Sequence, residues 1–214
     1  MEKIVIYGAG GFGKEVACIL NKINEKTTTW DLIGFIDDGI EKGTIISHFG
    51  EVLGGIDYLN NLQEEISIVF AIGVPRIIKL IVEKINNPRV QFPNIIHPDV
   101  FFADEYSLSM GMGNVIVRAC TFSCDVKLGD FNQMNSISSL AHDVEVGSFN
   151  VFMPLSRISG GAKIGDLNLF GIGSVIFQNI KIGNNTRISA GSYVMRSTKD
   201  GFLYAGNPAK KFDI

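Results

Sequence analysis

Large apolar residues recur at every sixth position through the C-terminal half of the chain. Fifteen successive positions of this spacing hold Met110, Ile116, Phe122, Leu128, Met134, Leu140, Val146, Phe152, Ile158, Ile164, Phe170, Ile176, Ile182, Ile188 and Val194. Four residues after each of them the side chain is mostly small or polar, as at Ser138, Ala162 and Ser174. This period predicts short stacked strands that each turn one large side chain inward, with the small residue inward near a corner.

Each six-residue unit of this pattern is called a hexad here. Glycines in the same region follow a second, longer period and recur once in every three hexads. They stand at Gly111, Gly129, Gly147, Gly165 and Gly183. One hexad for each face and three faces for each turn describe a triangular prism of parallel strands, a left-handed parallel β-helix. The array predicts five coils after an irregular one over residues 95–109, with glycine permitting the tight corners. An antiparallel sandwich would need alternating positions and turns about every 8–12 residues, and it would not produce the glycine period.

The first 95 residues follow another pattern, in which short apolar runs alternate with stretches of helical spacing. The runs predict strands at residues 4–7, 32–36 and 66–73, and the spacing predicts helices over residues 14–24 and 76–85. Such alternation is typical of an α/β Rossmann-like domain with a parallel sheet. Asparagine and proline at residues 86–88 and Pro93 mark a boundary, so we expect domains at residues 1–95 and 96–214.

Charge and composition exclude several classes of function. The net charge of −3 favours neither nucleic acid nor an anionic membrane as a partner. No apolar run is long enough to cross a membrane and the N-terminus lacks the features of a signal peptide, so we expect a cytoplasmic protein without a membrane span. Three cysteines argue against a disulfide framework, and Cys120 and Cys124 lack the further ligands of a zinc site, so we expect no metal.

A glycine-rich loop follows the first predicted strand and precedes the first predicted helix. Its glycines are Gly8, Gly10, Gly11 and Gly13. Backbone amides at the start of a helix can hold a phosphate, and Asp37 or Asp38 closes the second strand where a dinucleotide fold contacts ribose. Because this domain has only half the length of a full dinucleotide fold, a nucleotide-sugar site fits better than an NAD-dependent oxidoreductase. The alternative is a loop that only packs the strand against the helix.

Two motifs flank the repeat array and carry a resemblance to a known family. They are YGAGGFG at residues 7–13 and LYAGNPAK at residues 203–210. With the hexads, they resemble the hexapeptide-repeat acyltransferases, and in particular the PglD- and NeuD-like sugar acetyltransferases, over essentially the whole chain. The resemblance implies a homotrimer with acetyl-CoA in a groove between neighbouring β-helices. It also implies N-acetyl transfer to a nucleotide-linked amino sugar in bacterial surface glycan biosynthesis.

His142 is the candidate base for such a reaction. Leu140 and Val144 should point inward, so the His142 ring should lie outside the prism. Acetyl transfer needs a base to take a proton from the attacking group, and imidazole suits that task near neutral pH. The segment resembles the one that bears the family's catalytic histidine, and Asp143 stands where an acidic neighbour could orient the ring. The alternative is a solvated surface histidine.

Further residues are assigned to the substrates, some by the resemblance and some by their expected place on the prism. For the nucleotide sugar they are Gly73, Arg76 and Asn135, and for acetyl-CoA they are Asn150, Gly171, Gly173, Ala190, Gly191 and Lys210. Two positions depart from relatives, because Phe12 replaces a histidine of the glycine loop and Asn150 replaces a second histidine near the thioester. O-acetylation of a sugar such as sialic acid, or a non-catalytic nucleotide-sugar-binding trimer, are the competing functions.

Overall fold

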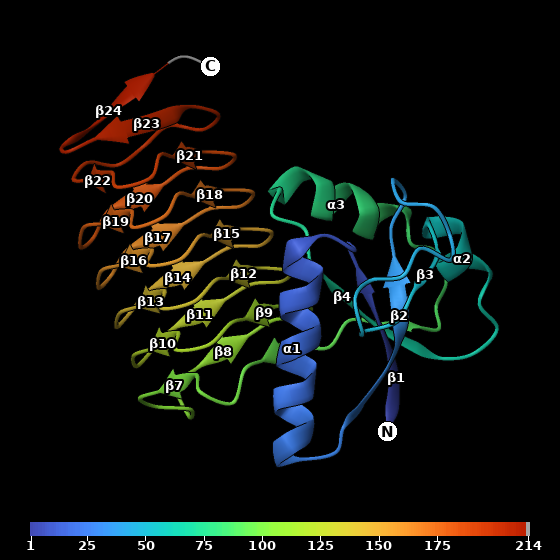
Figure 1. The fold of residues 1–214 in the computed structure, drawn as a ribbon. Helices are drawn as coiled ribbons and strands as arrows, with labels where there is room; N and C mark the ends of the chain where they lie inside the picture. The colour runs from blue at the N-terminus through green and yellow to red at the C-terminus, as the bar shows by residue number, and fades with distance from the viewer. Residues whose placement is uncertain (213–214) are drawn as a thin grey trace. The chain divides into compact units, whose positions relative to one another are not determined.

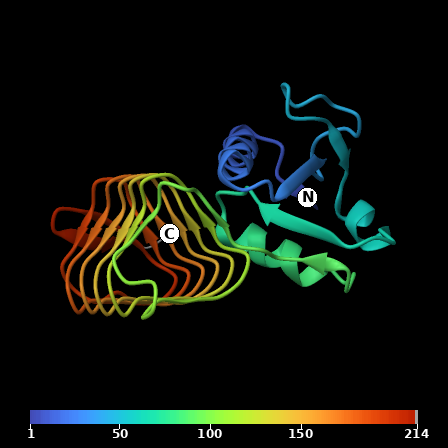
Figure 2. The same ribbon diagram turned by 90° about the horizontal axis from the view of Figure 1, so that it is seen from below.

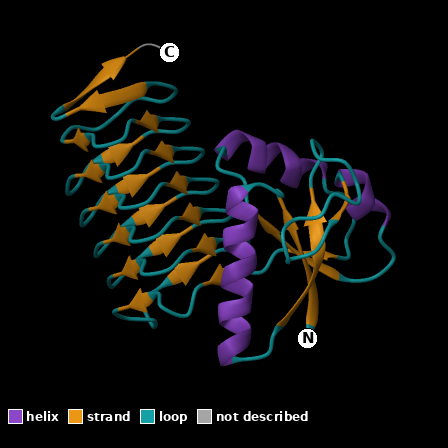
Figure 3. Cartoon of the chain, in the orientation of Figure 1, coloured by secondary structure: helices purple, strands orange, loops and turns teal. Residues whose placement is uncertain are grey.

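The computed structural model describes residues 1–212, in two compact units that divide after Pro98. The sequence predicted this boundary after residue 95. Figure 3 shows the helices in the first unit and short strands joined by turns in the second. Within the described residues, no helix combines the length and the apolar character needed to cross a membrane.

The first unit is a parallel sheet with three helices. Its elements are β1 (Glu2–Tyr7), α1 (Gly11–Lys26), β2 (Trp30–Ile36), β3 (Val52–Gly54), α2 (Ile56–Asn61), β4 (Ile66–Phe70), α3 (Pro75–Lys84) and β5 (Val90–Gln91). The sheet order is β3-β2-β1-β4-β5, and every pairing within it is parallel. The Rossmann-like prediction is therefore confirmed. The sequence missed β3, α2 and β5 because elements this short carry no readable period.

The core of this sheet follows from its sequence. All five residues of β4 are buried, as expected for a parallel strand covered on both faces. From α1, the side chains of Val16, Ile19 and Leu20 are buried at helical spacing. Both α1 and α3 begin in the loops that follow β1 and β4, and α3 has proline in its first turn, where the missing amide hydrogen costs nothing.

The second unit is a left-handed parallel β-helix of five regular coils. Its first face carries β8 (Ser109–Met110), β11 (Lys127–Leu128), β14 (Glu145–Val146), β17 (Lys163–Ile164) and β20 (Lys181–Ile182). The second carries β9 (Val115–Ile116), β12 (Gln133–Met134), β15 (Val151–Phe152), β18 (Leu169–Phe170) and β21 (Arg187–Ile188), then β23 (Leu203–Gly206) and β24 (Ala209–Phe212). The third carries β7 (Phe101–Phe102), β10 (Thr121–Phe122), β13 (Ser139–Leu140), β16 (Arg157–Ile158), β19 (Val175–Ile176) and β22 (Tyr193–Val194). In the chain, β6 (Ile95–Ile96) stands between β5 and β7.

From β8 to β22, the strands on each face pair in parallel, and paired residues are three hexads apart in the chain. For example, Thr121 pairs with Ser139, and Ser139 with Arg157. At the end of the second face, β23 pairs with β24 in the antiparallel direction. Figure 1 shows the strands climbing in three columns, and Figure 2 shows the coils lying one behind another. The prediction that each hexad forms one face of the prism is thus confirmed, as is the prediction that the longer glycine period corresponds to one coil.

The interior of the β-helix holds the large apolar side chains that the hexads predicted. Fourteen of the fifteen are at most 6% exposed, and Met110 on the first regular coil is half-buried. The rings of Phe152 and Phe170 stack across successive coils, with centroids 4.5 Å apart and planes within 4°. Ser138, Ala162 and Ser174 are fully buried, as predicted for the small inward positions.

Three corners join the faces, and we number them by their order in the first regular coil. The first corner covers residues 111–114, the second 117–120 and the third 123–126, and each recurs once in every later coil. A positive φ recurs at each corner and is mostly carried by residues other than glycine, such as Ile137 at 64° and Asp143 at 59°. The corner glycines are needed for another reason than the sequence suggested. A Cβ on Gly147 would lie 2.1 Å from Oδ1 of Asp166 and 2.9 Å from the carbonyl oxygen of Gly165 on the next coil.

A buried ladder of asparagines runs inside the first corner. Its members are Asn114, Asn132, Asn150 and Asn168, all fully buried, with Thr186 at the next step. The Asn132 Oδ1 accepts hydrogen bonds from the backbone and side-chain nitrogens of Asn150, at 2.9 and 3.0 Å. The same pair of bonds joins Asn168 to Asn150. The ladder satisfies polar groups that would otherwise be buried without partners, and it ties each coil to the next.

Candidate active site

The glycine loop lies at the carboxyl edge of the parallel sheet, where ligands bind in folds of this class. Gly8 has a φ of 110°, and a Cβ there would lie 2.6 Å from the carbonyl oxygen of Ala71. A Cβ on Gly13 would lie 2.1 Å from the Gly8 carbonyl oxygen, so these two glycines serve close packing. By contrast, no atom lies within 4 Å of a Cβ placed on Gly10 or Gly11. Gly10 and Gly11 are exposed at the N-terminus of α1, where backbone amides favour an anion.

Asp37 and Asp38 follow β2 at the same edge and bind the surrounding backbone. The Asp37 Oδ2 accepts a hydrogen bond from the amide of Ala9 at 2.9 Å, inside the glycine loop. The Asp38 Oδ1 accepts from the amide of Ile56 at 2.9 Å, at the start of α2, and its Oδ2 accepts from the hydroxyl of Tyr7. Burial and this hydrogen bond raise the pKa of Tyr7 above its usual range. The carboxylates therefore shape the loop, a role that the sequence did not reveal.

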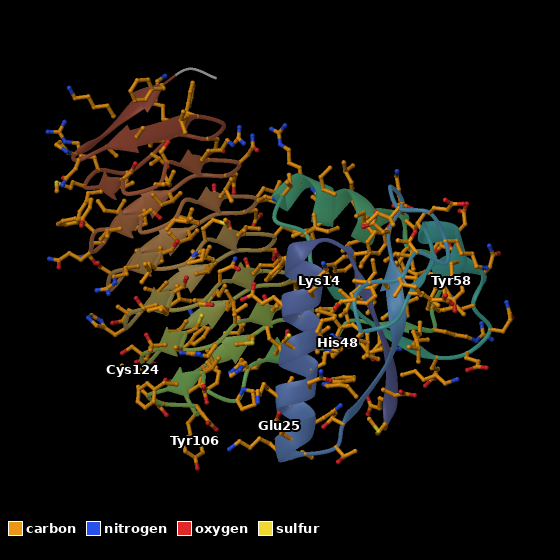
Figure 4. The ribbon with its side chains drawn as sticks, viewed as in Figure 1. Lys14, Glu25, His48, Tyr58, Tyr106 and Cys124 are labelled. Carbon is orange, nitrogen blue, oxygen red and sulfur yellow. The ribbon has the colours of Figure 1, made fainter. Side chains whose placement is uncertain are left out.

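The loop after β4 brings the remaining predicted nucleotide contacts to this edge. Gly73 and Arg76 are both exposed, and Arg76 lies in the first turn of α3. Phe12, which replaces the histidine of relatives, is half-buried in the first turn of α1. Figure 4 labels Lys14 just beyond it, at the same end of the helix. Two helix N-termini and two carboxylates thus border one edge of the sheet, because β1 lies between β2 and β4.

His142 lies on the third corner of the β-helix with its side chain 62% exposed. Leu140 and Val144 on either side are buried, so the prediction that the ring lies outside the prism is confirmed. The ring Nδ1 lies 2.8 Å from Oδ2 of Asp143. A neutral imidazole that donates from Nδ1 to this carboxylate presents an unprotonated Nε2 to solvent. Cys124 occupies the equivalent position one coil earlier, on the outer edge labelled in Figure 4.

The residues assigned to the acceptor sugar and to the arm of acetyl-CoA gather on the second corner. They are Asn135, Gly171, Gly173, Ala190 and Gly191, which fall at equivalent or adjacent positions of successive coils. No atom lies within 4 Å of a Cβ on Gly173 or Gly191, whereas Ile137 and Leu155 fill that column of the earlier coils with exposed side chains. Gly171 differs, because its Cβ would lie 2.4 Å from the nitrogen of Ala190. The last two coils therefore present a strip of open backbone.

The structure corrects the role assigned to Asn150. Its side chain is fully buried in the asparagine ladder, where it bonds to Asn132 and Asn168. An amide inside the prism cannot donate to a thioester bound on the surface, so Asn150 is a structural residue. Lys210, in contrast, is exposed on β24 near the end of the described chain.

The predicted residues of the β-helix do not form one site within a single chain. His142 and Asp143 lie on the third corner, whereas Asn135 and the open strip lie on the second, with strands such as β13 between them. Gly160, which sequence reasoning missed, lies on the third corner against the His142 ring. The signal that could have found it is the step of one coil from His142. Across residues 1–212, no group of three or more histidine, cysteine or acidic side chains could hold a metal ion.

Comparisons with known proteins agree with this architecture. Residues 3–85 match the family described as the PglD N-terminal domain. The acetyltransferase domain of PglB from Neisseria gonorrhoeae FA1090, solved in complex with acetyl coenzyme A, is 29% identical, with a TM-score of 0.88 and 99% of each chain covered. WeeI from Acinetobacter baumannii AYE is 27% identical, with a TM-score of 0.88 over 99% of this chain and 100% of that one.

A more distant structure shares the fold. PerB from Caulobacter crescentus, solved with CoA and GDP-perosamine, is 24% identical, with a TM-score of 0.87 over 100% of this chain and 98% of that one. No curated protein matches the chain closely enough to count as a relative. Residues 3–85 therefore match the PglD N-terminal domain family, and the chain is similar over almost its whole length to the PglB acetyltransferase domain and to WeeI.

Proposed function

We propose that the protein is an acetyl-CoA-dependent N-acetyltransferase that acts on an amino sugar linked to a nucleotide. One observation carries the proposal: an exposed His142–Asp143 pair lies on a β-helix whose chain resembles, over 99% of its length, an acetyltransferase domain solved with acetyl coenzyme A. An exposed histidine with an oriented ring is the group that such a transfer needs as its base.

The chemistry is a direct transfer between the two substrates. Nε2 of His142 takes a proton from the amine as its nitrogen attacks the thioester carbon. The new C–N bond forms, the C–S bond breaks, and coenzyme A leaves as the thiolate, which the protonated imidazole can reprotonate. Asp143 holds the ring through Nδ1 and stabilises the charge that develops on it during the attack.

The first unit supplies contacts to the nucleotide in this proposal. The exposed backbone of Gly10 and Gly11 at the N-terminus of α1 suits a phosphate group. Asp37 shapes the loop through Ala9, and Arg76 adds a positive charge at the same edge. These are the groups that a nucleoside diphosphate requires, namely backbone donors and a cation.

A homotrimer completes the proposed site. His142 lies on the third corner and the open strip at Gly173 and Gly191 on the second, so one β-helix cannot bring them together. A second copy that sets its second corner beside the third corner of the first would form the groove, and a closed ring of three copies repeats that contact. We place the enzyme in the cytoplasm, because acetyl-CoA and nucleotide sugars are both made there.

The test is a transfer assay with acetyl-CoA and a panel of UDP-, GDP- and dTDP-linked amino sugars, read by mass spectrometry. We expect one amino sugar to gain an acetyl group, and His142→Ala to lower kcat by about 10²–10⁴-fold. Acetylation of a sugar hydroxyl instead of an amine would contradict the N-acetyl assignment. A wild-type rate for His142→Ala would overturn the role of the base, and a monomer at all concentrations would overturn the groove.

A further inference from the structure

Gly160 stands at the position equivalent to His142 on the next coil, three hexads further along the chain. A Cβ built on Gly160 would lie 2.5 Å from both Cε1 and Nε2 of His142 and 3.1 Å from Nδ1. These ring atoms are the three nearest heavy atoms to that position. The imidazole of His142 therefore lies against the bare α-carbon of Gly160.

The backbone gives no other reason for glycine at this position. Gly160 is not among the residues of positive φ, so alanine could adopt its conformation. Its neighbour Gly161 has a φ of 68°, and a Cβ there would meet Oδ1 of Asn179 at 2.3 Å and not the histidine ring. In the described column of Tyr106, Cys124, His142, Gly160, Gln178 and Arg196, only Gly160 lacks a side chain.

We propose that Gly160 is a positioning residue for His142, which sets the place of the imidazole by lacking a side chain. This inference rests on the proposed function, in which His142 is the base. The Gly161 amide donates to the His142 carbonyl at 2.9 Å and holds these two coils together, and the Asn179 amide donates to the Gly160 carbonyl at 3.0 Å and holds Gly160 against the following coil. A methyl group on Gly160 would therefore displace the ring more readily than the backbone.

Two contacts then set the tautomer and the position of the His142 ring. Asp143 binds Nδ1 and fixes which nitrogen is free, while Gly160 supports the edge that carries Cε1 and Nε2. A side chain as exposed as that of His142 would otherwise sample several rotamers. Because a displacement of about 1 Å at a reacting group can cost roughly 10²-fold in rate, the support bears directly on catalysis.

The test is Gly160→Ala, with Gly161→Ala as the matched control. We expect Gly160→Ala to lower kcat by about 10–100-fold, with the KM values for both substrates within about twofold of wild type. Gly161→Ala strains the same corner without touching the ring, so it should lower thermal stability at least as much while keeping most of kcat. A wild-type kcat for Gly160→Ala, or an equal loss of kcat in both variants, would overturn the proposal.

A double-mutant cycle separates an effect through His142 from any other effect of Gly160. If Gly160 acts by placing the ring, adding Gly160→Ala to His142→Ala causes no further loss of kcat. A full further loss in that background would contradict the inference. If His142→Ala alone kept the wild-type rate, the proposed function would fail instead, so the two failures are distinguishable.

Nuclear magnetic resonance gives a readout that does not depend on turnover. The sequence has three histidines, so the ring signals of His142 can be assigned by their loss in His142→Ala. We expect Gly160→Ala to shift these signals while those of His48 and His97 stay in place. Unchanged His142 signals in Gly160→Ala would overturn the inference even if the rate fell.

Discussion

Nδ1 of His142 lies 2.8 Å from Oδ2 of Asp143, and the two residues are neighbours in the chain. Adjacent side chains usually diverge, but Asp143 has a φ of 59° at a corner, and its carboxylate lies beside the ring. Asp125, one coil earlier, has a φ of 56° at the equivalent position. The corner geometry of the β-helix thus supplies the partner of the histidine without any contribution from a distant segment.

The first prediction concerns this pair. Asp143→Asn keeps a residue that tolerates positive φ but removes the charge that orients and stabilises the imidazole. We expect kcat to fall by about tenfold or more with KM values nearly unchanged, measured in the transfer assay. Asp125→Asn is the control and should leave kcat unaffected. Equal effects of the two substitutions would contradict the special role of Asp143.

The second prediction distinguishes the structural role of Asn150 from the substrate-binding role of Asn135. Asn150→Ala removes the acceptor for two nitrogens of Asn168, so it should lower the free energy of unfolding by about 2–4 kcal/mol. The KM for acetyl-CoA should not change if the variant remains folded at the assay temperature. Asn135→Ala should instead raise the KM for the acceptor sugar with a smaller loss of stability. Denaturant unfolding and steady-state kinetics test both, and a raised KM for acetyl-CoA in Asn150→Ala would restore its earlier assignment.

The third prediction concerns the glycine loop. Gly13→Ala places a methyl group against the Gly8 carbonyl and should cost about 1–3 kcal/mol of stability. Gly11→Ala meets no atom and lies in the first turn of α1, so the domain should stay folded. If the loop binds phosphate, Gly11→Ala should still raise the KM for the nucleotide sugar by about tenfold, or about 1.4 kcal/mol. An unchanged KM would mean that the loop serves packing alone.

The fourth prediction is a pH dependence of stability. Burial raises the pKa of the Cys120 thiol to about 11. The unfolded chain loses this proton from about pH 8.5, whereas the folded protein keeps it, so the free energy of unfolding falls as the pH rises through this interval. Cys120→Ala should flatten the slope between about pH 8 and 10. The raised pKa of Tyr7 acts in the same direction only above about pH 10. Urea unfolding across this range tests the prediction, and an identical slope in Cys120→Ala would contradict it.

The sequence predicted the β-helix in detail because its period is strict. Each anchor such as Phe152 meets its counterpart Phe170 at a fixed step of three hexads, so one pattern encodes both the face and the neighbour. Elements without such repetition escaped prediction. β3 has three residues and α2 has six, and tertiary contacts hold both in place. A single sequence does not show such contacts.

The sequence predicted where His142 lies, but it did not predict which residues hold the other parts of the candidate site in position. His142 could be placed outside the prism because Leu140 and Val144 had to face inward. Asn150 was misassigned because it was compared with a histidine of relatives and not with Asn132 and Asn168, its own neighbours on the adjacent coils. The bonds from Ala9 to Asp37 and from Tyr7 to Asp38 depend on how separate strands meet, which no local pattern records.

The asparagine ladder also limits how this architecture can change its length. Asn132 and Asn150 bond to the neighbouring rungs and to backbone carbonyls of their own or the next coil, so a whole coil could be removed or duplicated with the remaining bonds intact. An insertion of any other size within a strand would displace asparagine from the interior and bring another kind of residue in its place. Variation in the height of the prism is therefore confined to steps of whole coils, while extra sequence of arbitrary length can be accommodated only as loops that bulge from its corners.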